Sequence, residues 1–188
     1  MKNLFLGCIL LLILLSGCET ENNQELLDIQ LQKETQKINS FIRNNPFPFE
    51  KEYSDPTLGI RVFWTEVSAT GKKPNFGDTL ILDYVARRFD IPNWVLDTSI
   101  QSVAENMGSG FSDRDFFGPV KYIFGSSFGK LASGFEIVFP LMEEGDKVTA
   151  FFPSRYGNQN PTQTRITPNI PLIFELELLE IRGAKYGD

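Results

Sequence analysis

The sequence predicts an α+β fold, in which a curved antiparallel sheet of five to six strands wraps on one short helix, with an N-terminal helical extension. The first observation is that the apolar residues change from a helical to a strand-like spacing after Asp55-Pro56. The second is that the strand-like segments follow one another with turn residues between them. The third is that a single short helical stretch, residues 133–142, falls among these strands rather than alternating with them, which favours α+β over α/β.

The first 17 residues have the features of a bacterial lipoprotein signal peptide. Lys2 precedes an apolar run, Leu4 to Leu15, that is too short to span a bilayer as a mature helix. Leu15-Ser16-Gly17-Cys18 then resembles the lipobox, whose cysteine is lipidated and becomes the new N-terminus. This resemblance implies lipidation at Cys18 and a lipid-anchored protein of the cell envelope. Glu19 after the cysteine favours the outer membrane, facing the periplasm, and the acidic run that follows is the basis for the alternative location on the cell surface. The alternative is an ordinary secretory signal with an incidental cysteine.

The composition excludes several classes of chemistry. The chain has no histidine, and its two cysteines are Cys8, inside the signal, and Cys18. Catalysis by a serine–histidine or cysteine–histidine pair is therefore excluded, and we expect no metal and no cofactor. The 24 acidic residues outnumber the 18 basic ones, which argues against a nucleic-acid partner. Seventeen phenylalanines should fill a core, and some of them could line a pocket.

Residues 18–55 are expected to form a polar tether followed by an amphipathic helix. From Gln24 to Asn44 the apolar residues fall on one helical face, and Asn45-Pro46 ends the pattern. Glu34 and Thr35 interrupt this face. Because no heptad repeat is present, we expect the helix to pack on its own domain or to act as a spacer rather than to dimerise, and we expect a monomer. A dimerisation helix remains the alternative.

Residues 56–188 are expected to form one domain. The predicted strands cover residues 60–66, 79–88, 95–99, 119–124, 146–153 and 171–181. The last of them alternates most clearly, with Leu172, Phe174 and Leu176 on one face. Residues 100–118 are predicted to be a loop. The short helix is expected to end at Glu144-Gly145, with Pro140 kinking it or ending it early.

Three segments of the sequence carry motifs in a recognisable order. The first is Phe76-Gly77-Asp78 followed by Leu82-Asp83-Tyr84, and the second runs from Gly134-Phe135-Glu136 to Met142 and Gly145-Asp146-Lys147. The third comprises Phe152-Pro153-Ser154, Tyr156-Gly157 and the stretch from Ile166 to Leu178. In their order and spacing, over roughly residues 58–182, these segments resemble the FKBP family of peptidyl-prolyl cis/trans isomerases, and the resemblance implies an FKBP-like domain. The chain also resembles, more loosely, isomerase lipoproteins associated with gliding motility.

The resemblance implies an envelope isomerase that assists the folding of exported, proline-containing polypeptides. Rotation about an X–Pro bond requires loss of amide resonance but no covalent intermediate, metal or cofactor. An aromatic pocket that favours the twisted amide over the planar one is enough. The alternative is a non-catalytic FKBP-like binding module or chaperone on the same lipid anchor.

The family's pocket residues are carried over by motif position. The resemblance assigns the catalytic positions to Tyr84, Asp97, Phe135, Tyr156 and Phe174, with Asp97 near the substrate carbonyl and Phe135 in the place of the family's helix tryptophan. It assigns the substrate-binding positions to Leu96, Val120, Leu131, Ala132 and Ile166, where the backbone N–H of Ala132 would meet a ligand carbonyl.

Each assignment has a structural alternative. Phe135 and Phe174 could be core residues, Tyr84 a buried phenol with its hydrogen bond satisfied, and Asp97 a turn cap. Leu96 replaces an aromatic residue of the family, which is expected to weaken catalysis.

Overall fold

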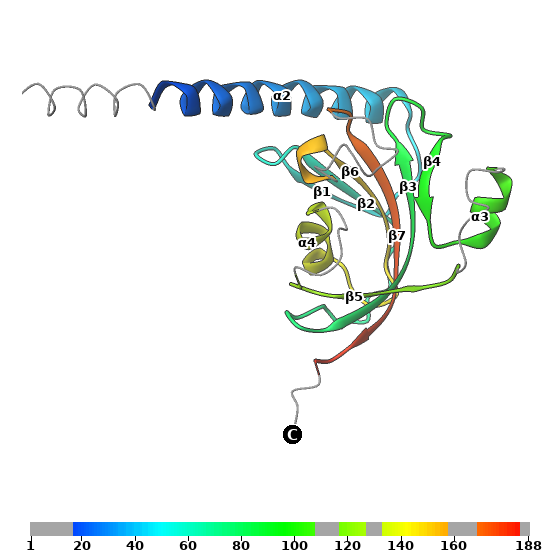
Figure 1. Ribbon diagram of the computed structural model, residues 1–188. Coiled ribbons are helices and arrows are strands. Elements are labelled where there is room, and N and C mark those ends of the chain that lie inside the picture. Colours follow the sequence, from blue (N-terminus) through cyan, green and yellow to red (C-terminus); the bar gives the residue numbers. More distant parts are fainter. Residues whose placement is uncertain (1–16, 108–116, 127–132, 158–168, 185–188) are drawn as a thin grey trace, which may run out of the picture.

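The computed structural model of the chain describes residues 17–107, 117–126, 133–157 and 169–184 (Figure 1). It has the expected α+β fold, with an antiparallel sheet curved around a short helix and a long helix at the N-terminus. The predicted signal sequence up to Ser16 lies outside the described residues. Within them, no helix has the combination of length and apolar character that crossing a membrane requires.

The sheet has seven strands in the described residues, in the order β1-β2-β6-β7-β3-β4, and β5 pairs with β3 as well. Every pairing is antiparallel, and the most extensive joins β3 to β7. The strands are β1 (Lys51–Asp55), β2 (Ile60–Glu66), β3 (Thr79–Arg88), β4 (Val95–Thr98), β5 (Val120–Ile123), β6 (Lys147–Phe152) and β7 (Leu172–Arg182).

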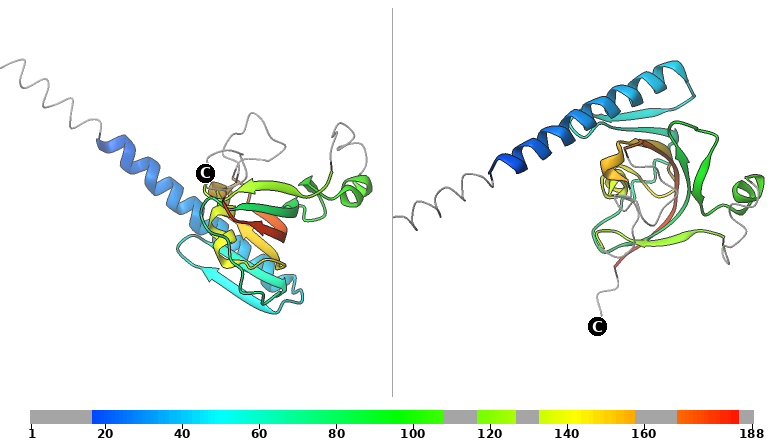
Figure 2. Two further views of the ribbon diagram at one scale, coloured as in Figure 1. Left: turned by 90° about the horizontal axis from the view of Figure 1, so that it is seen from below. Right: turned by 45° about the horizontal axis from the view of Figure 1, so that its top comes forward.

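One face of the sheet curves around α4 (Gly134–Val138) and forms the inner core (Figures 1 and 2). Alternate residues of each strand point to this face, as the pleat requires. On β7 these are Leu172, Phe174, Leu176 and Leu178, so the alternation read from the sequence is confirmed. The helix becomes the 3-10 helix η2 (Phe139–Leu141) at Pro140, which has no backbone N–H to continue the α-helical pattern.

The opposite face carries α2 (Gly17–Asn44), which lies along the outside of the sheet (Figures 1 and 2). Ile38 packs there in an outer core with Phe63 of β2, Phe151 of β6 and Ile173 of β7. Further rings surround it: Phe41 lies 5.9 Å from Phe151 and Phe47 lies 5.2 Å from Phe63, between ring centroids. The described part of the helix therefore packs on its own domain at its C-terminal half.

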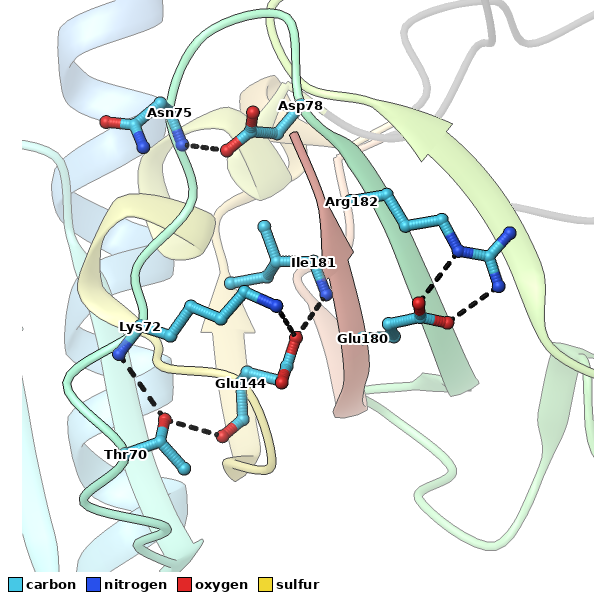
Figure 3. A network of polar contacts seen from close by, with 8 residues as sticks. All are labelled: Thr70, Lys72, Asn75, Asp78, Glu144, Glu180, Ile181 and Arg182. Carbon is cyan, nitrogen blue, oxygen red and sulfur yellow. Dashed lines mark hydrogen bonds and ion pairs between the residues drawn. The ribbon is translucent and has the colours of Figure 1, made fainter. Parts of the chain in front are cut away.

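Polar contacts fix the connection between β2 and β3 to Glu144, which follows η2, and Glu144 in turn contacts Ile181 of β7 (Figure 3). Lys72 Nζ donates to Glu144 Oε2 at 2.6 Å, and the same oxygen accepts from the Ile181 N–H of β7. Thr70 Oγ1 donates to the Glu144 carbonyl at 3.0 Å. The Lys72 ammonium lowers the pKa of the Glu144 carboxyl, and the Ile181 N–H lowers it further. This network joins the residues that follow η2, the connection between β2 and β3, and the strand β7.

Three features differ from the sequence-based expectations. The sheet gains β1, which lies in the segment predicted to be tether and helix, so it has seven strands rather than five to six. The long helix begins at Gly17, so the predicted tether is helical. Residues 100–118 were predicted to be loop, and their described part contains the short helix α3 (Gln101–Asn106). The predicted helix end at Asn44 is confirmed.

Candidate functional site

The aromatic residues assigned to the pocket lie together on the inner face of the sheet. Tyr84 on β3 is opposite Leu176 on β7, and Phe174 on β7 is opposite Ala86 on β3. Residues directly opposite in an antiparallel pair share a face. Tyr84 and Phe174 therefore point to the same side, and both belong to the inner core.

Phe135 reaches these residues from α4. Its ring centroid lies 4.7 Å from that of Phe174 in an edge-to-face arrangement, and 5.5 Å from that of Phe139. Phe152 of β6 closes the group at 5.5 Å from Phe174. Edge-to-face contacts between rings are favourable, and this cluster forms the aromatic part of the inner core. Phe135 is completely buried, whereas Phe174 keeps 6% of its surface exposed.

A β-bulge turns two successive residues of β4 toward this face. Ala86 on β3 pairs with Asp97, but Arg87 pairs with Val95, so Leu96 is the extra residue. A bulge redirects side chains that would otherwise alternate. Leu96 accordingly joins the inner core, while Asp97 accepts a 2.6 Å hydrogen bond from the hydroxyl of Tyr84.

The Asp97 carboxylate is held from two sides. Oδ2 accepts from Tyr84, and Oδ1 accepts from the Thr98 N–H at 2.9 Å. Asp97 is half-buried at the edge of the aromatic cluster. The site thus combines a carboxylate, a phenol and several rings contributed by β3, β4, β7 and α4.

Tyr156 lies on the 3-10 helix η3 (Ser154–Tyr156), which only Pro153 separates from the end of β6. It is half-buried and packs against the inner core. Burial raises the pKa of the Tyr156 phenol, and the nearby Arg155 guanidinium opposes this rise. The phenol is therefore a neutral hydroxyl at neutral pH and can both donate and accept a hydrogen bond.

Among the predicted substrate-binding residues, Leu96 is 7% exposed and Val120 packs against the inner core from β5. Leu131, Ala132 and Ile166 lie outside the described residues. The backbone of Cys18 is part of α2, and its side chain is not described. In the described residues, no group of three or more histidine, cysteine, aspartate or glutamate side chains could hold a metal ion.

The sequence reading missed two residues near the site. Tyr122 on β5 is 6% exposed, and its hydroxyl donates a hydrogen bond to Glu136 on α4. Burial raises the pKa of the Glu136 carboxyl, against a hydrogen bond from the Gly125 backbone. The alternation of Val120, Tyr122 and Phe124 in the predicted strand places the tyrosine on the inner face, and this was the available signal.

Comparisons with known proteins agree with this arrangement. Residues 71–179, more than half of the chain, match the family described as FKBP-type peptidyl-prolyl cis-trans isomerase. A Neurospora crassa protein named FK506-binding protein 1B is 28% identical over 115 residues, which cover 61% of this chain and 91% of that protein.

Two solved structures share the fold. FkpA from Escherichia coli superposes with a TM-score of 0.57 at 16% identity, over 92% of this chain and 70% of FkpA. A peptidyl-prolyl cis-trans isomerase from Pseudomonas syringae pv. tomato gives a TM-score of 0.55 at 24% identity, over 82% of this chain and 95% of that structure.

Proposed function

Because this chain belongs to the FKBP-type peptidyl-prolyl cis-trans isomerase family, we propose that it is held at the cell envelope by a lipid on Cys18 and there speeds the folding of exported, proline-containing polypeptides. The family match covers the sheet strands β3 to β6, α4 and most of β7. It begins after α2, β1 and β2, so α2 and the proposed lipid site lie outside the matched region.

The reaction requires a surface that binds a prolyl amide better when it is twisted than when it is planar. Isomerisation of an X–Pro bond is slow because its barrier is about 20 kcal/mol. A twisted amide has lost resonance, so its carbonyl is less dipolar and easier to place against apolar groups. Phe174 and Leu96, which keep 6% and 7% of their surface exposed, supply such groups, Phe135 packs behind Phe174, and none of the three needs to titrate.

The polar groups at the edge of the aromatic cluster have a complementary role. The Asp97 carboxylate, fixed by Tyr84 and the Thr98 N–H, would face the substrate carbonyl carbon as the amide twists. The neutral phenol of Tyr156 would donate to a substrate carbonyl. Leu96 offers less surface to the proline ring than an aromatic residue would, so we expect a moderate rather than a maximal rate.

The observation that carries the proposal is the meeting of Tyr84, Asp97, Phe135, Tyr156 and Phe174 around one core, although they come from five separate elements. The full chain in detergent should accelerate cis-to-trans conversion of an Ala-Leu-Pro or Ala-Phe-Pro peptide in a protease-free assay. A rate equal to the uncatalysed background would instead favour the non-catalytic binding module.

The anchor is tested separately. Cys18→Ser should abolish incorporation of labelled fatty acid and release the protein from the membrane fraction, with isomerase activity retained. Stable anchoring to the membrane requires two acyl chains, because a single chain gives only weak, reversible membrane binding. Unchanged labelling and fractionation of the variant would exclude Cys18 as the lipid site.

A further inference from the structure

We infer that Glu34 of α2 is a positioning residue for the isomerase site, because it fixes the short helix η3 that carries Tyr156. This inference rests on the proposed role of Tyr156 in the substrate pocket. It gives the N-terminal helix, which lies outside the matched family region, a direct connection to the site.

Glu34 is a buried carboxylate in a helix that is otherwise mostly exposed. Its residue is 1% exposed. Oε1 accepts from the hydroxyl of Ser154 at 2.8 Å, and Oε2 accepts from the backbone N–H of Ser154 at 2.5 Å. Gln30, one turn earlier on α2, donates to Oε1. Both carboxylate oxygens are thus used to hold one residue of the isomerase domain.

Ser154 is the first residue of η3, so holding it orients Tyr156. Within the turn, the Tyr156 N–H donates to the Pro153 carbonyl and the Gly157 N–H donates to the Ser154 carbonyl, both at 3.0 Å. The far end is confined as well, since a Cβ on Gly157 would lie 2.6 Å from Leu172 Cδ1. The segment has little freedom while Glu34 holds its beginning.

Thr35 provides a second contact beside the first. The turn between β1 and β2 approaches α2 at Gly59, whose φ is +69°, and a Cβ there would lie 2.2 Å from Thr35 Oγ1 and 3.1 Å from Pro153 Cγ. The two residues that interrupt the apolar face of the helix therefore both lie beside η3. The polarity of Glu34 has a structural cause in its bonds to Ser154, whereas the Thr35 hydroxyl donates to the Leu31 carbonyl of its own helix at 2.8 Å.

A carboxylate is a poor choice if the only need is to attach the helix. Burying a charge carries a desolvation penalty that its hydrogen bonds must offset, and apolar replacements of similar size are often as stable. Attachment is already provided by Ile38 in the outer core. Glu34 adds a defined orientation of Ser154, because its two carboxylate oxygens bind the N–H and the hydroxyl of that one residue.

The test is a double-mutant cycle on the full chain in detergent. Glu34→Ala should lower kcat/KM for an X–Pro peptide about tenfold, since misplacing a binding group by about 1 Å can cost a hundredfold. In a Tyr156→Ala background, the same change should alter kcat/KM less than twofold, because Glu34 acts through Tyr156. Equal effects of Glu34→Ala in both backgrounds would overturn the inference.

Two further variants keep the test decisive. Glu34→Gln keeps one acceptor oxygen, so its kcat/KM should lie between those of the parent and of Glu34→Ala. It replaces Glu34→Ala in the test if Glu34→Ala folds poorly. Ile38 lies one turn after Glu34 on the same helix and packs in the outer core. As a control, Ile38→Val should leave kcat/KM unchanged while lowering the free energy of unfolding by about 1 kcal/mol. An inactive parent chain would instead refute the proposed function. An active parent with a fully active Glu34→Ala variant would refute only the positioning role.

Discussion

Asp146→Asn should destabilise the domain strongly at neutral pH and much less in acid. Asp146 precedes β6 and is 3% exposed. Oδ2 accepts from Trp64 Nε1–H and the Glu143 N–H, both at 2.8 Å, and Oδ1 accepts from the N–H and hydroxyl of Ser68 at 2.8 and 2.9 Å. It thereby joins β2, the connection that follows β2, and the helix exit.

The magnitude follows from the donors that asparagine cannot satisfy. Its amide has one oxygen and one NH₂, so either orientation turns a donor toward two existing donors. The less harmful orientation places the NH₂ group toward Ser68. The Ser68 hydroxyl can then rotate to accept a hydrogen bond from it, while the Ser68 backbone N–H is left unpaired. An unpaired N–H costs about 1–3 kcal/mol when it is buried, and because Ser68 is half-buried the lower part of this range applies. The remaining bonds also weaken when the charge is removed, and relief of charge burial offsets part of the sum, which leaves a loss of about 1–3 kcal/mol.

The pH dependence has a definite sign. Burial would raise the pKa of the Asp146 carboxyl, but hydrogen bonds from Ser68, Glu143 and Trp64 together outweigh it and lower that pKa. An acid with a lowered pKa in the folded state stabilises the protein above the pKa of the unfolded chain, about 3.9, and loses this contribution as the pH falls through the folded-state pKa. The difference between parent and variant should therefore narrow as the pH falls from about 5 toward 2.

Equilibrium urea unfolding followed by tryptophan fluorescence, at several pH values, measures this difference directly. Asp90→Asn is the control, because Asp90 also has a lowered pKa, from its hydrogen bond with Arg88, but is exposed. It should change the free energy of unfolding far less. A parent and an Asp146→Asn variant of equal stability at pH 7, or a difference that does not vary with pH, would refute the reasoning.

Two further substitutions test other parts of the structure. Gly59→Ala should lower the free energy of unfolding by about 1–3 kcal/mol more than Gly71→Ala, measured by thermal or urea unfolding. Both glycines have a φ near +70°, but only a Cβ on Gly59 would clash with α2. Equal losses of stability would show that α2 is not packed against Gly59. Asp97→Asn should lower kcat/KM about tenfold in the peptide assay, whereas Asp83→Asn, on the outer face of β3, should not; full activity of Asp97→Asn would make that carboxylate a structural cap only.

The strands were predictable where one face of the sheet is buried and the other is partly exposed. On β7 the inner residues are apolar and several outer ones are glutamates, so the period of two is visible in the sequence. On β1 no such contrast exists, since its residues are exposed or half-buried and it lies at the sheet edge. The strand is defined by pairing with β2, which no local pattern reports.

The site was predictable at the level of motif position but not of geometry. Alternation along β4 would send Leu96 and Asp97 to opposite faces, and only the bulge opposite Ala86 and Arg87 turns both inward. Phe135 and Phe174 belong to one continuous aromatic cluster, so the sequence could not separate a core residue from a pocket residue.

The role of the N-terminal helix depends on contacts distant in sequence. Glu34 and Thr35 appear in the sequence as defects in an apolar face. Their partners, Ser154 and Gly59, are brought to them only by the folded sheet. A polar interruption of an amphipathic helix has many possible causes, and the sequence alone could not select this one.

The most direct test of prolyl isomerisation on the inner aromatic face compares two phenylalanines of neighbouring strands. Phe174 points to the inner face and Phe151 to the outer face of the same sheet. Each change to leucine should lower stability by about 1 kcal/mol. In the protease-free peptide assay, Phe174→Leu should reduce kcat/KM at least fivefold while Phe151→Leu leaves it within twofold of the parent. Equal activity of the two variants would contradict the assignment of catalysis to the inner face.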